Sequence, residues 1–314
     1  MTHGGLQLGR KPAADDVAGP GRSPLRIAWG RLRRDPVAVV SAAVVLLLVA
    51  VAFAAPLVAR ITGHGPDVQF RETGLTSDGL PVGPGARFWL GTDDLGRDVL
   101  VRIAYGTRIS LVVGVLATVL AVAVGVVVGL LAGFLGGVVD TALGRLMDVV
   151  LSFPFLLFAI ALVSIAGSSL TVSVLVIAFF SWATVGRIVR GQALSIRERD
   201  YVEAARSLGA GAARIMFREV LPNLVATVIV YTTLLIPTAI VFEATLSFLG
   251  LGVVPPTPSW GSMLADSLQY YQVAWWFALF PGLALLVTTL AFNLLGDAVR
   301  DALDPHTARL SVRS

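Results

Sequence analysis

Two long stretches without a charged side chain constrain this sequence most. Residues 37–59 form one such stretch of 23 residues, and residues 109–139 form another of 31. About 20 apolar residues in a helix cross the roughly 30 Å hydrocarbon layer of a bilayer. Only 14% of the 314 residues are charged, against about 25% in a typical soluble domain, and the mean hydropathy is +0.81. The sequence therefore predicts an all-α polytopic membrane protein.

Apolar runs separated by charged or turn-forming residues divide the chain into six predicted transmembrane helices. We predict spans at residues 37–59, about 109–131, 149–166, 170–186, 224–242 and 275–296. Gly125 and Gly129 form a small-x-x-x-small pair on the second span, which permits close packing against another helix. Pro154 is expected near the inner end of the third span, and Asp140, Arg145 and Asp148 in a brief inner loop before it.

The segments between the spans complete the predicted organisation. We expect a cytoplasmic N-terminal tail (1–36), an extracytoplasmic loop (60–108), a five-helix core (109–297) that includes a cytoplasmic loop (191–223), and a cytoplasmic tail (298–314). The first 23 residues are expected to be unstructured. Residues 24–35 mix apolar side chains with four arginines, which suits either a short helix on the inner membrane face or a basic flank that orients the first span.

The distribution of basic residues predicts the orientation. With both termini inside, the Lys and Arg residues divide into 18 inside and 6 outside, and all six outer ones lie in the first loop. Basic residues concentrate in cytoplasmic loops of membrane proteins. Both termini and residues 191–223 are therefore predicted to be cytoplasmic, and the basic pI is explained without nucleic-acid binding.

The chain offers little for catalysis. It has no cysteine, three histidines outside the apolar runs, and one lysine, Lys11, which is not in a phosphate-binding loop. We therefore predict no catalytic residue, no metal site, no bound cofactor and no ATPase activity. An ion-coupled secondary carrier would need ionisable residues at mid-membrane depth. Glu243 alone lies near this position, at the outer end of the fifth span, and is expected to order the outer turn or to gate substrate.

The first outer loop ends in a segment rich in charge. Asp93 and Asp94 are predicted to lie at the N-terminus of a short helix on the outer membrane surface, since carboxylates stabilise that end of a helix. Arg97 and Asp98 are described equally well by a solvated loop of balanced charge.

Residues 200–223 form the longest charged interruption in the apolar second half of the chain. Glu203, Ala204 and Ala205 lie in a helix-forming run, glycines 209 and 211 mark a break, and Leu221-Pro222 closes the segment before the next span. Two short helices meeting at a glycine corner are predicted. Because the paired alanines have no bulk, the first helix can approach a partner closely, so we interpret this segment as a docking device.

The pattern Glu203, Ala204, Ala205, Gly209, Leu221 and Pro222 resembles the cytoplasmic coupling loop of bacterial ABC-transporter permeases. The general family pattern has Ile at the position of Glu219, and a polar residue there is more similar to the peptide-transporter branch. Residues 91–111, 248–261 and 293–305 resemble three further segments of the dipeptide, oligopeptide and nickel permeases of the C type. The resemblance covers residues 29–305.

This resemblance implies a type I ABC importer permease fold in a bacterial inner membrane. It implies a heterodimer with a second, homologous permease, two ABC ATPase subunits or one fused ATPase that carry ATP and Mg²⁺, and an extracytoplasmic substrate-binding protein. The expected cargo is a di- or oligopeptide; a nickel chelate or glutathione is the alternative. Glu203 would orient the docked helix, Ala204 and Ala205 would permit the close approach, and Gly209 would allow the turn.

Overall fold

The structure is a computed structural model that describes residues 24–303, and every named element in that range is a helix. The expectations for residues 1–23 and 304–314 lie outside the described residues. The elements are α1 (Pro24–Leu32), α2 (Pro36–Thr62), α3 (Val99–Leu135), α4 (Gly137–Ser152), α5 (Phe155–Ala166), α6 (Leu170–Arg197), α7 (Asp200–Ser207), α8 (Ala212–Ile215), the π-helix η1 (Met216–Val220), α9 (Leu221–Phe248), α10 (Trp260–Ser267) and α11 (Trp275–Leu303).

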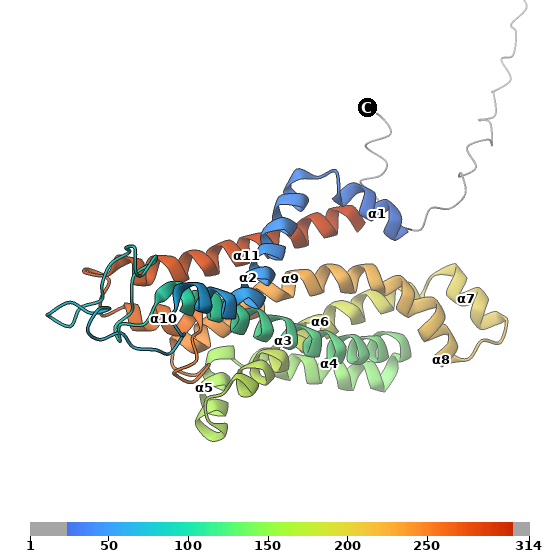
Figure 1. Ribbon diagram of the computed structural model, residues 1–314. Coiled ribbons are helices and arrows are strands. Elements are labelled where there is room, and N and C mark those ends of the chain that lie inside the picture. The colour runs from blue at the N-terminus through green and yellow to red at the C-terminus, as the bar shows by residue number, and fades with distance from the viewer. Residues whose placement is uncertain (1–23, 304–314) are drawn as a thin grey trace, which may run out of the picture.

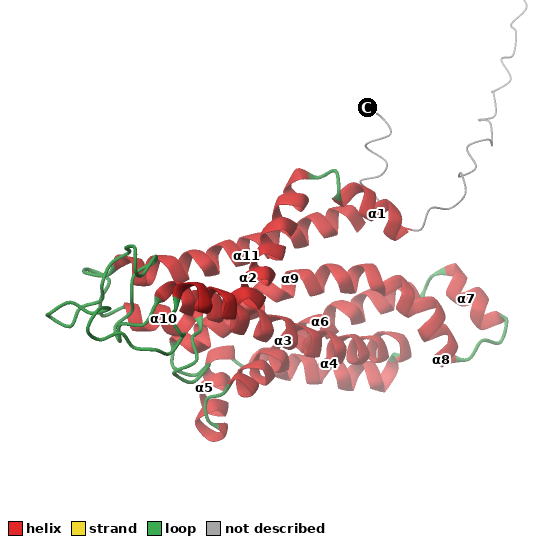
Figure 2. Ribbon diagram, in the orientation of Figure 1, coloured by secondary structure: helices red, strands yellow, loops and turns green. Residues whose placement is uncertain are grey.

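The long helices lie along a common direction, and the connecting segments gather at the two ends of the bundle (Figure 1). The loop of residues 63–98 and α10 lie at one end, which we call the loop end, where Figure 2 shows most of the green loop segments. Helices α7 and α8 project from the opposite end, which we call the α7 end. By length and composition, five helices can cross a membrane, or six if α4 and α5 form one span. This confirms the predicted class of fold.

Glycines bring α3 and α6 into backbone contact. A Cβ atom added to Gly125 would lie 2.7 Å from the carbonyl oxygen of Trp182, and one added to Gly133 would lie 2.5 Å from that of Arg190. Gly129 faces the carbonyl oxygen of Gly186 in the same row. The prediction that Gly125 and Gly129 permit close packing is confirmed, and α3 and α6 form the centre of the bundle.

The third span differs most from the prediction, which placed it at 149–166 with Pro154 near its inner end. Helix α4 already begins at Gly137, runs for 16 residues, and is followed by α5 after a bend of 85°. The bend lies at Pro154. Proline disfavours a helical conformation in the residue before it, and Phe153 is accordingly extended, which ends α4. Asp140, Arg145 and Asp148 therefore lie on a helix, and the prediction that they mark a loop was wrong.

Other helices extend beyond the predicted spans. Helix α3 begins at Val99, because the side chain of Asp98 accepts hydrogen bonds from the amides of Leu100 (2.9 Å) and Val101 (3.3 Å) and so caps the helix. The short surface helix predicted before the second span is therefore the first part of the span helix itself. Helix α6 continues to Arg197 and α11 to Leu303. Both helices are longer than the predicted spans because the prediction followed the apolar residues only, whereas the helices continue into charged turns.

Candidate functional site: the α7–α8 segment

Helix α7 is short and ends in a turn that requires glycine. The amide of Gly209 donates to the carbonyl of Arg206 (3.0 Å), and the amide of Ala210 donates to the carbonyl of Ala205 (3.1 Å). This pair of bonds is a Schellman motif, in which the residue after the helix adopts a left-handed conformation. Gly209 has φ of +81°, a value that costs an L-residue about 1–2 kcal/mol. The predicted glycine corner is therefore located at Gly209.

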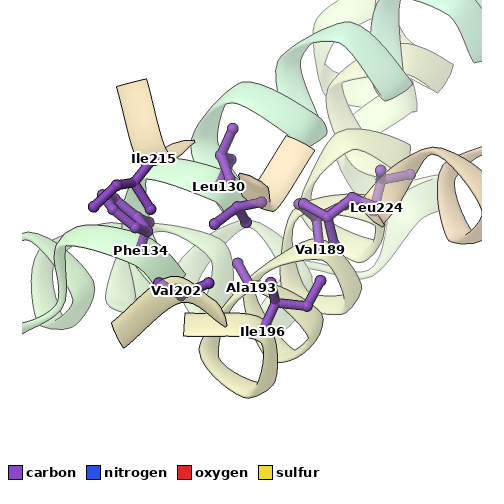
Figure 3. Close-up of a cluster of buried hydrophobic side chains, with 10 residues drawn as sticks. Leu130, Phe134, Val189, Ala193, Ile196, Val202, Ile215 and Leu224 are labelled. Atoms are coloured by element: carbon purple, nitrogen blue, oxygen red, sulfur yellow. The ribbon is translucent and has the colours of Figure 1, made fainter. Parts of the chain in front are cut away.

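A cluster of buried apolar side chains fixes this segment to the bundle (Figure 3). Val202 of α7, Ile215 of α8 and Val220 of η1 contribute from the segment. They pack with residues of α3, α6 and α9, namely Leu130, Phe134, Val185, Val189, Ala193, Ile196 and Leu224. Burying each of the valine, leucine, isoleucine and phenylalanine side chains of this cluster away from water stabilises the fold by about 1.5–3 kcal/mol. The cluster therefore connects α7 and α8 to the ends of three long helices, α3, α6 and α9.

The opposite side of the segment carries exposed apolar side chains. Leu208 is 88% exposed, Phe217 60% and Tyr201 42%. Leu208 lines a hollow of about 270 Å³ together with Ala205, Gly209, Ala210, Arg214, Ile215 and Glu219. Exposed apolar groups that project from one end of a molecule, here with Leu208 beside a hollow, are typical of a protein interaction site.

The residues predicted for docking are only partly brought together. Glu203 and Ala204 are exposed on α7, Ala205 is half-buried at the hollow, and Gly209 forms the corner. Leu221 and Pro222 lie elsewhere, in the first turn of α9. The segment was expected to close at this Leu-Pro pair, but α8, η1 and α9 continue into one another, so Pro222 lies inside a continuous helical stretch, directly after the π-helical turn η1.

The loop end is held together by buried ion pairs that join the first loop to α3. Arg97 Nε lies 2.6 Å and Arg102 Nε 3.2 Å from Oδ2 of Asp93, which is fully buried. Oδ2 of Asp98 lies 2.6 Å from Nδ1 of His64. Asp93 and Asp94 were predicted to lie at a helix N-terminus, and this was wrong. The residue at the N-terminus of α3 is Asp98. Arg97 and Asp98 are buried, so the alternative of a solvated loop was wrong.

Two further contacts tie this loop to more distant elements. The indole Nε1 of Trp276, at the start of α11, donates to the carbonyl of Thr92 (3.2 Å). Arg102 donates to the carbonyl of Pro66 (3.1 Å). The pKa of Asp94 is raised, first by burial and then by the neighbouring charges of Asp93 and Asp266. Burial likewise raises the pKa of Asp266. The loop end therefore presents carboxylates whose ionised form is destabilised by their surroundings.

Glu243 is fully buried near the end of α9. Its carboxylate accepts hydrogen bonds from the hydroxyls of Ser110 of α3 and Ser247 of α9, both 2.8 Å long. Because the Glu243 side chain has no access to solvent, this geometry agrees with a structural role in ordering the outer turn and places no Glu243 oxygen on an open surface.

Sequence reasoning did not find the partners in these charge networks. Arg190 of α6 binds Asp140 of α4 through both carboxylate oxygens, and Arg187 donates to Asp148 (2.7 Å). The pairs are separated by 50 and 39 residues, and no local pattern connects them. Among residues 24–303, no group of three or more His, Cys, Asp or Glu side chains is placed to hold a metal ion.

Comparison with known protein families gives two matches along the chain. Residues 125–309 match the model described as binding-protein-dependent transport system inner membrane component. Residues 23–74 match the model for the N-terminal transmembrane domain of oligopeptide transport permease C. Together these matches include α2, the α3–α6 packing and the α7–α8 segment.

Individual proteins are similar over nearly the whole chain. The dipeptide transport system permease protein DppC of Escherichia coli K12 is 47% identical over 283 residues, which cover 90% of this chain and 93% of that protein. The DppC of Alkalihalophilus pseudofirmus is 42% identical, with 90% of each chain covered. The glutathione transport system permease protein GsiD of Pectobacterium atrosepticum is 43% identical, with 90% and 92% covered.

One solved structure supports the fold. A chain from the inward-facing MetNI methionine ABC transporter superposes with a TM-score of 0.54 at 17% identity, covering 66% of this chain and 96% of that one. At this identity the comparison bears on the fold alone.

Proposed function

The chain belongs to the family of inner membrane components of binding-protein-dependent transport systems, and we propose that it is the permease subunit of an ATP-driven importer of di- or oligopeptides. It forms half of the translocation path and receives energy from a separate ATPase. The observation that carries this proposal is the α7–α8 segment, which exposes apolar side chains outward and is joined by a buried cluster to three long helices.

The α7–α8 segment supports a mechanism that couples the ATPase to the helix bundle. An ATPase subunit holds α7 in a surface groove, with Glu203 orienting the helix and Ala204 and Ala205 allowing close approach. When ATP binding closes the ATPases, α7 moves, and the cluster around Val202 and Ile215 carries that motion into α3, α6 and α9. The bundle then opens alternately to the two sides of the membrane. ATP and Mg²⁺ are bound by the ATPase, and this chain performs no catalysis.

The proposed assembly has four kinds of component. A second, homologous permease completes the path as a heterodimer, and two ATPases or one fused ATPase bind at the α7 end. An extracytoplasmic binding protein delivers the cargo at the loop end, where the first loop and residues 250–274 lie. The α7 end and both termini are cytoplasmic in this arrangement, which agrees with the excess of basic residues there.

The relatives named above support peptides as the cargo, since two of them are dipeptide permeases by name and one is a glutathione permease. Glutathione is itself a small peptide and is the second candidate. A nickel chelate is the remaining alternative within the resemblance. No group of side chains in the described helices favours a nickel chelate. In the proposed assembly the binding protein selects the cargo.

Uptake of a labelled dipeptide into proteoliposomes tests this function. The vesicles would contain this chain, the second permease and the ATPases encoded with it, with the binding protein added outside. Uptake that requires internal ATP and this chain supports the proposal. The variant Ala204→Trp should abolish uptake while the chain still inserts, and Ala142→Trp, an exposed alanine on α4, should not. Uptake by this chain alone, driven by an ion gradient, would instead establish a secondary carrier.

A further inference from the structure

A cleft between α4 and α6 gathers charged side chains within apolar surroundings. It has a volume of about 240 Å³ and is lined by Asp140, Thr141, Gly144, Arg145, Met147, Asp148, Arg187 and Arg190. No other charged residue occurs between Arg108 and Arg187. Charged side chains in membrane-spanning helices are costly and commonly mark a binding site.

The depth of the cleft matches the boundary between lipid tails and headgroups. Arg187 follows Leu170, the first residue of α6, by 17 positions, which is about 26 Å along the helix. The hydrocarbon layer is roughly 30 Å thick. A helix that enters the layer near Leu170 therefore brings Arg187 and Arg190 to the opposite boundary, at the α7 end.

The charges in the cleft differ in how well they are paired. Arg190 is held by both oxygens of Asp140. Arg187 and Asp148 form a single hydrogen bond of 2.7 Å, and each side chain is more than half exposed. Arg145 is exposed and has no ion-pair partner within residues 24–303. Arg145 and Arg187 can therefore bind an anionic group, while the Asp148 carboxylate can accept hydrogen bonds from an ammonium group.

Exposed apolar side chains continue from the cleft along α4. Leu146, Val149 and Phe153 are all exposed, at 47%, 55% and 52%. Residues three or four positions apart share one face of a helix, so Leu146 and Val149 continue the face of Arg145 along α4, and Phe153 follows directly after the helix, at the bend before α5. A ligand that fits both features has a zwitterionic head and apolar tails.

We propose that the α4–α6 cleft binds the headgroup of phosphatidylethanolamine, with the lipid phosphate at Arg145 and Arg187 and the lipid ammonium at Asp148. The acyl chains lie along Leu146, Val149 and Phe153. A basic pocket between membrane helices is a common place for a lipid headgroup, and the carboxylate of Asp148 adds a preference for a headgroup that carries an N–H donor. A second protein chain covering this face would leave no room for the lipid.

Native mass spectrometry of the purified full chain tests the site. After delipidation, the chain is mixed with phosphatidylethanolamine, phosphatidylcholine or phosphatidylglycerol, and the retained lipid is counted. Wild-type chain should retain phosphatidylethanolamine best. Loss of one charged contact should lower retention about tenfold in Arg145→Gln and should remove the preference over phosphatidylcholine in Asp148→Asn. Arg145→Lys should recover most of the retention.

Two further results separate the proposal from its rivals. Arg300→Gln removes an exposed arginine from the same end of α11 and should leave retention unchanged. A circular dichroism melt of each variant shows whether the helices remain folded. Equal retention of the three lipids, or equal loss in Arg300→Gln and Arg145→Gln, would overturn the proposal. So would photo-crosslinking from position 145 in the assembled transporter that captures a protein chain in place of lipid.

Discussion

Ser110 on α3 donates a 2.8 Å hydrogen bond to the carboxylate of Glu243 on α9, across 133 residues of sequence. Both side chains are fully buried, so the bond joins two long helices at the loop end. Ser247 donates to the other oxygen of the same carboxylate at 2.8 Å. The buried carboxylate of Glu243 therefore connects the end of α9 to the first part of α3.

Removing this acceptor should destabilise the protein. Glu243→Ala leaves the hydroxyls of Ser110 and Ser247 buried without their partner, which costs about 1–3 kcal/mol. Glu243→Gln keeps an oxygen acceptor and should cost less. Thermal unfolding of the detergent-purified chain measures the difference. Thr238→Ala, which alters an exposed residue on the same helix, is the control; equal melting temperatures for Glu243→Ala and this control would contradict the structural role.

The contact between α3 and α6 predicts opposite effects for one substitution at two glycines. Gly125→Ala places a Cβ atom 2.7 Å from the Trp182 carbonyl and should destabilise the fold by about 1–3 kcal/mol. Gly191→Ala on α6 meets no atom within 4 Å and should be neutral, or stabilising by up to about 1 kcal/mol because alanine favours helix. Thermal melts compare the two, and a stable Gly125→Ala would exclude the close packing described.

Asp94 should lower the stability of the loop end at neutral pH. Its pKa in the folded chain is raised above the ordinary value of 3.8, mainly by burial, so the folded state binds the proton more tightly than the unfolded state does. Stability from this group is therefore greatest below pH 3.8 and falls as the pH rises through the raised pKa. Asp94→Asn should melt at a higher temperature than the wild type at pH 7, and the difference should shrink on acidification.

The matched control for this prediction is Asp78→Asn, an exposed position in the same loop. Melting curves of the three chains between pH 4 and 8 make the comparison. If Asp94→Asn is less stable than the wild type at pH 7, the ion pair with Arg97, 3.5 Å away, outweighs the effect of burial.

The turn after α7 should be sensitive to a single methyl group. Gly209→Ala forces an L-residue to φ of +81° and should release the Schellman motif at a cost of about 1–2 kcal/mol. Limited proteolysis near Leu208 should become faster, and peptide-stimulated ATP hydrolysis by the assembled transporter should fall. Gly211→Ala, at φ of −68° with no atom within 4 Å of the added methyl, should change neither; equal behaviour of the two variants would argue against a role for the corner.

The sequence was sufficient for the class of fold and for most of the α7–α8 segment. Charge-free runs locate helices such as α2, and the glycine at 209 signals a turn whose conformation only glycine adopts without cost. The break between α4 and α5 was misplaced because Asp140, Arg145 and Asp148 suggested a loop. On α4 the carboxylates of Asp140 and Asp148 are paired with Arg190 and Arg187 of α6, 50 and 39 residues later in the sequence. Burial of Arg97 and Asp98 was missed because their partners Asp93 and His64 come within 2.6 Å of them only in the folded chain.

Docking of an ATPase at the α7 end can be tested by site-directed photo-crosslinking in cells. A photoreactive amino acid is placed at Leu208, which is 88% exposed, and a matched one at Leu268 of the loop end, which is 58% exposed. Position 208 should capture a P-loop ATPase, identified by mass spectrometry, and position 268 should not. Capture of the ATPase at position 268, or of lipid alone at position 208, would contradict docking at the α7 end.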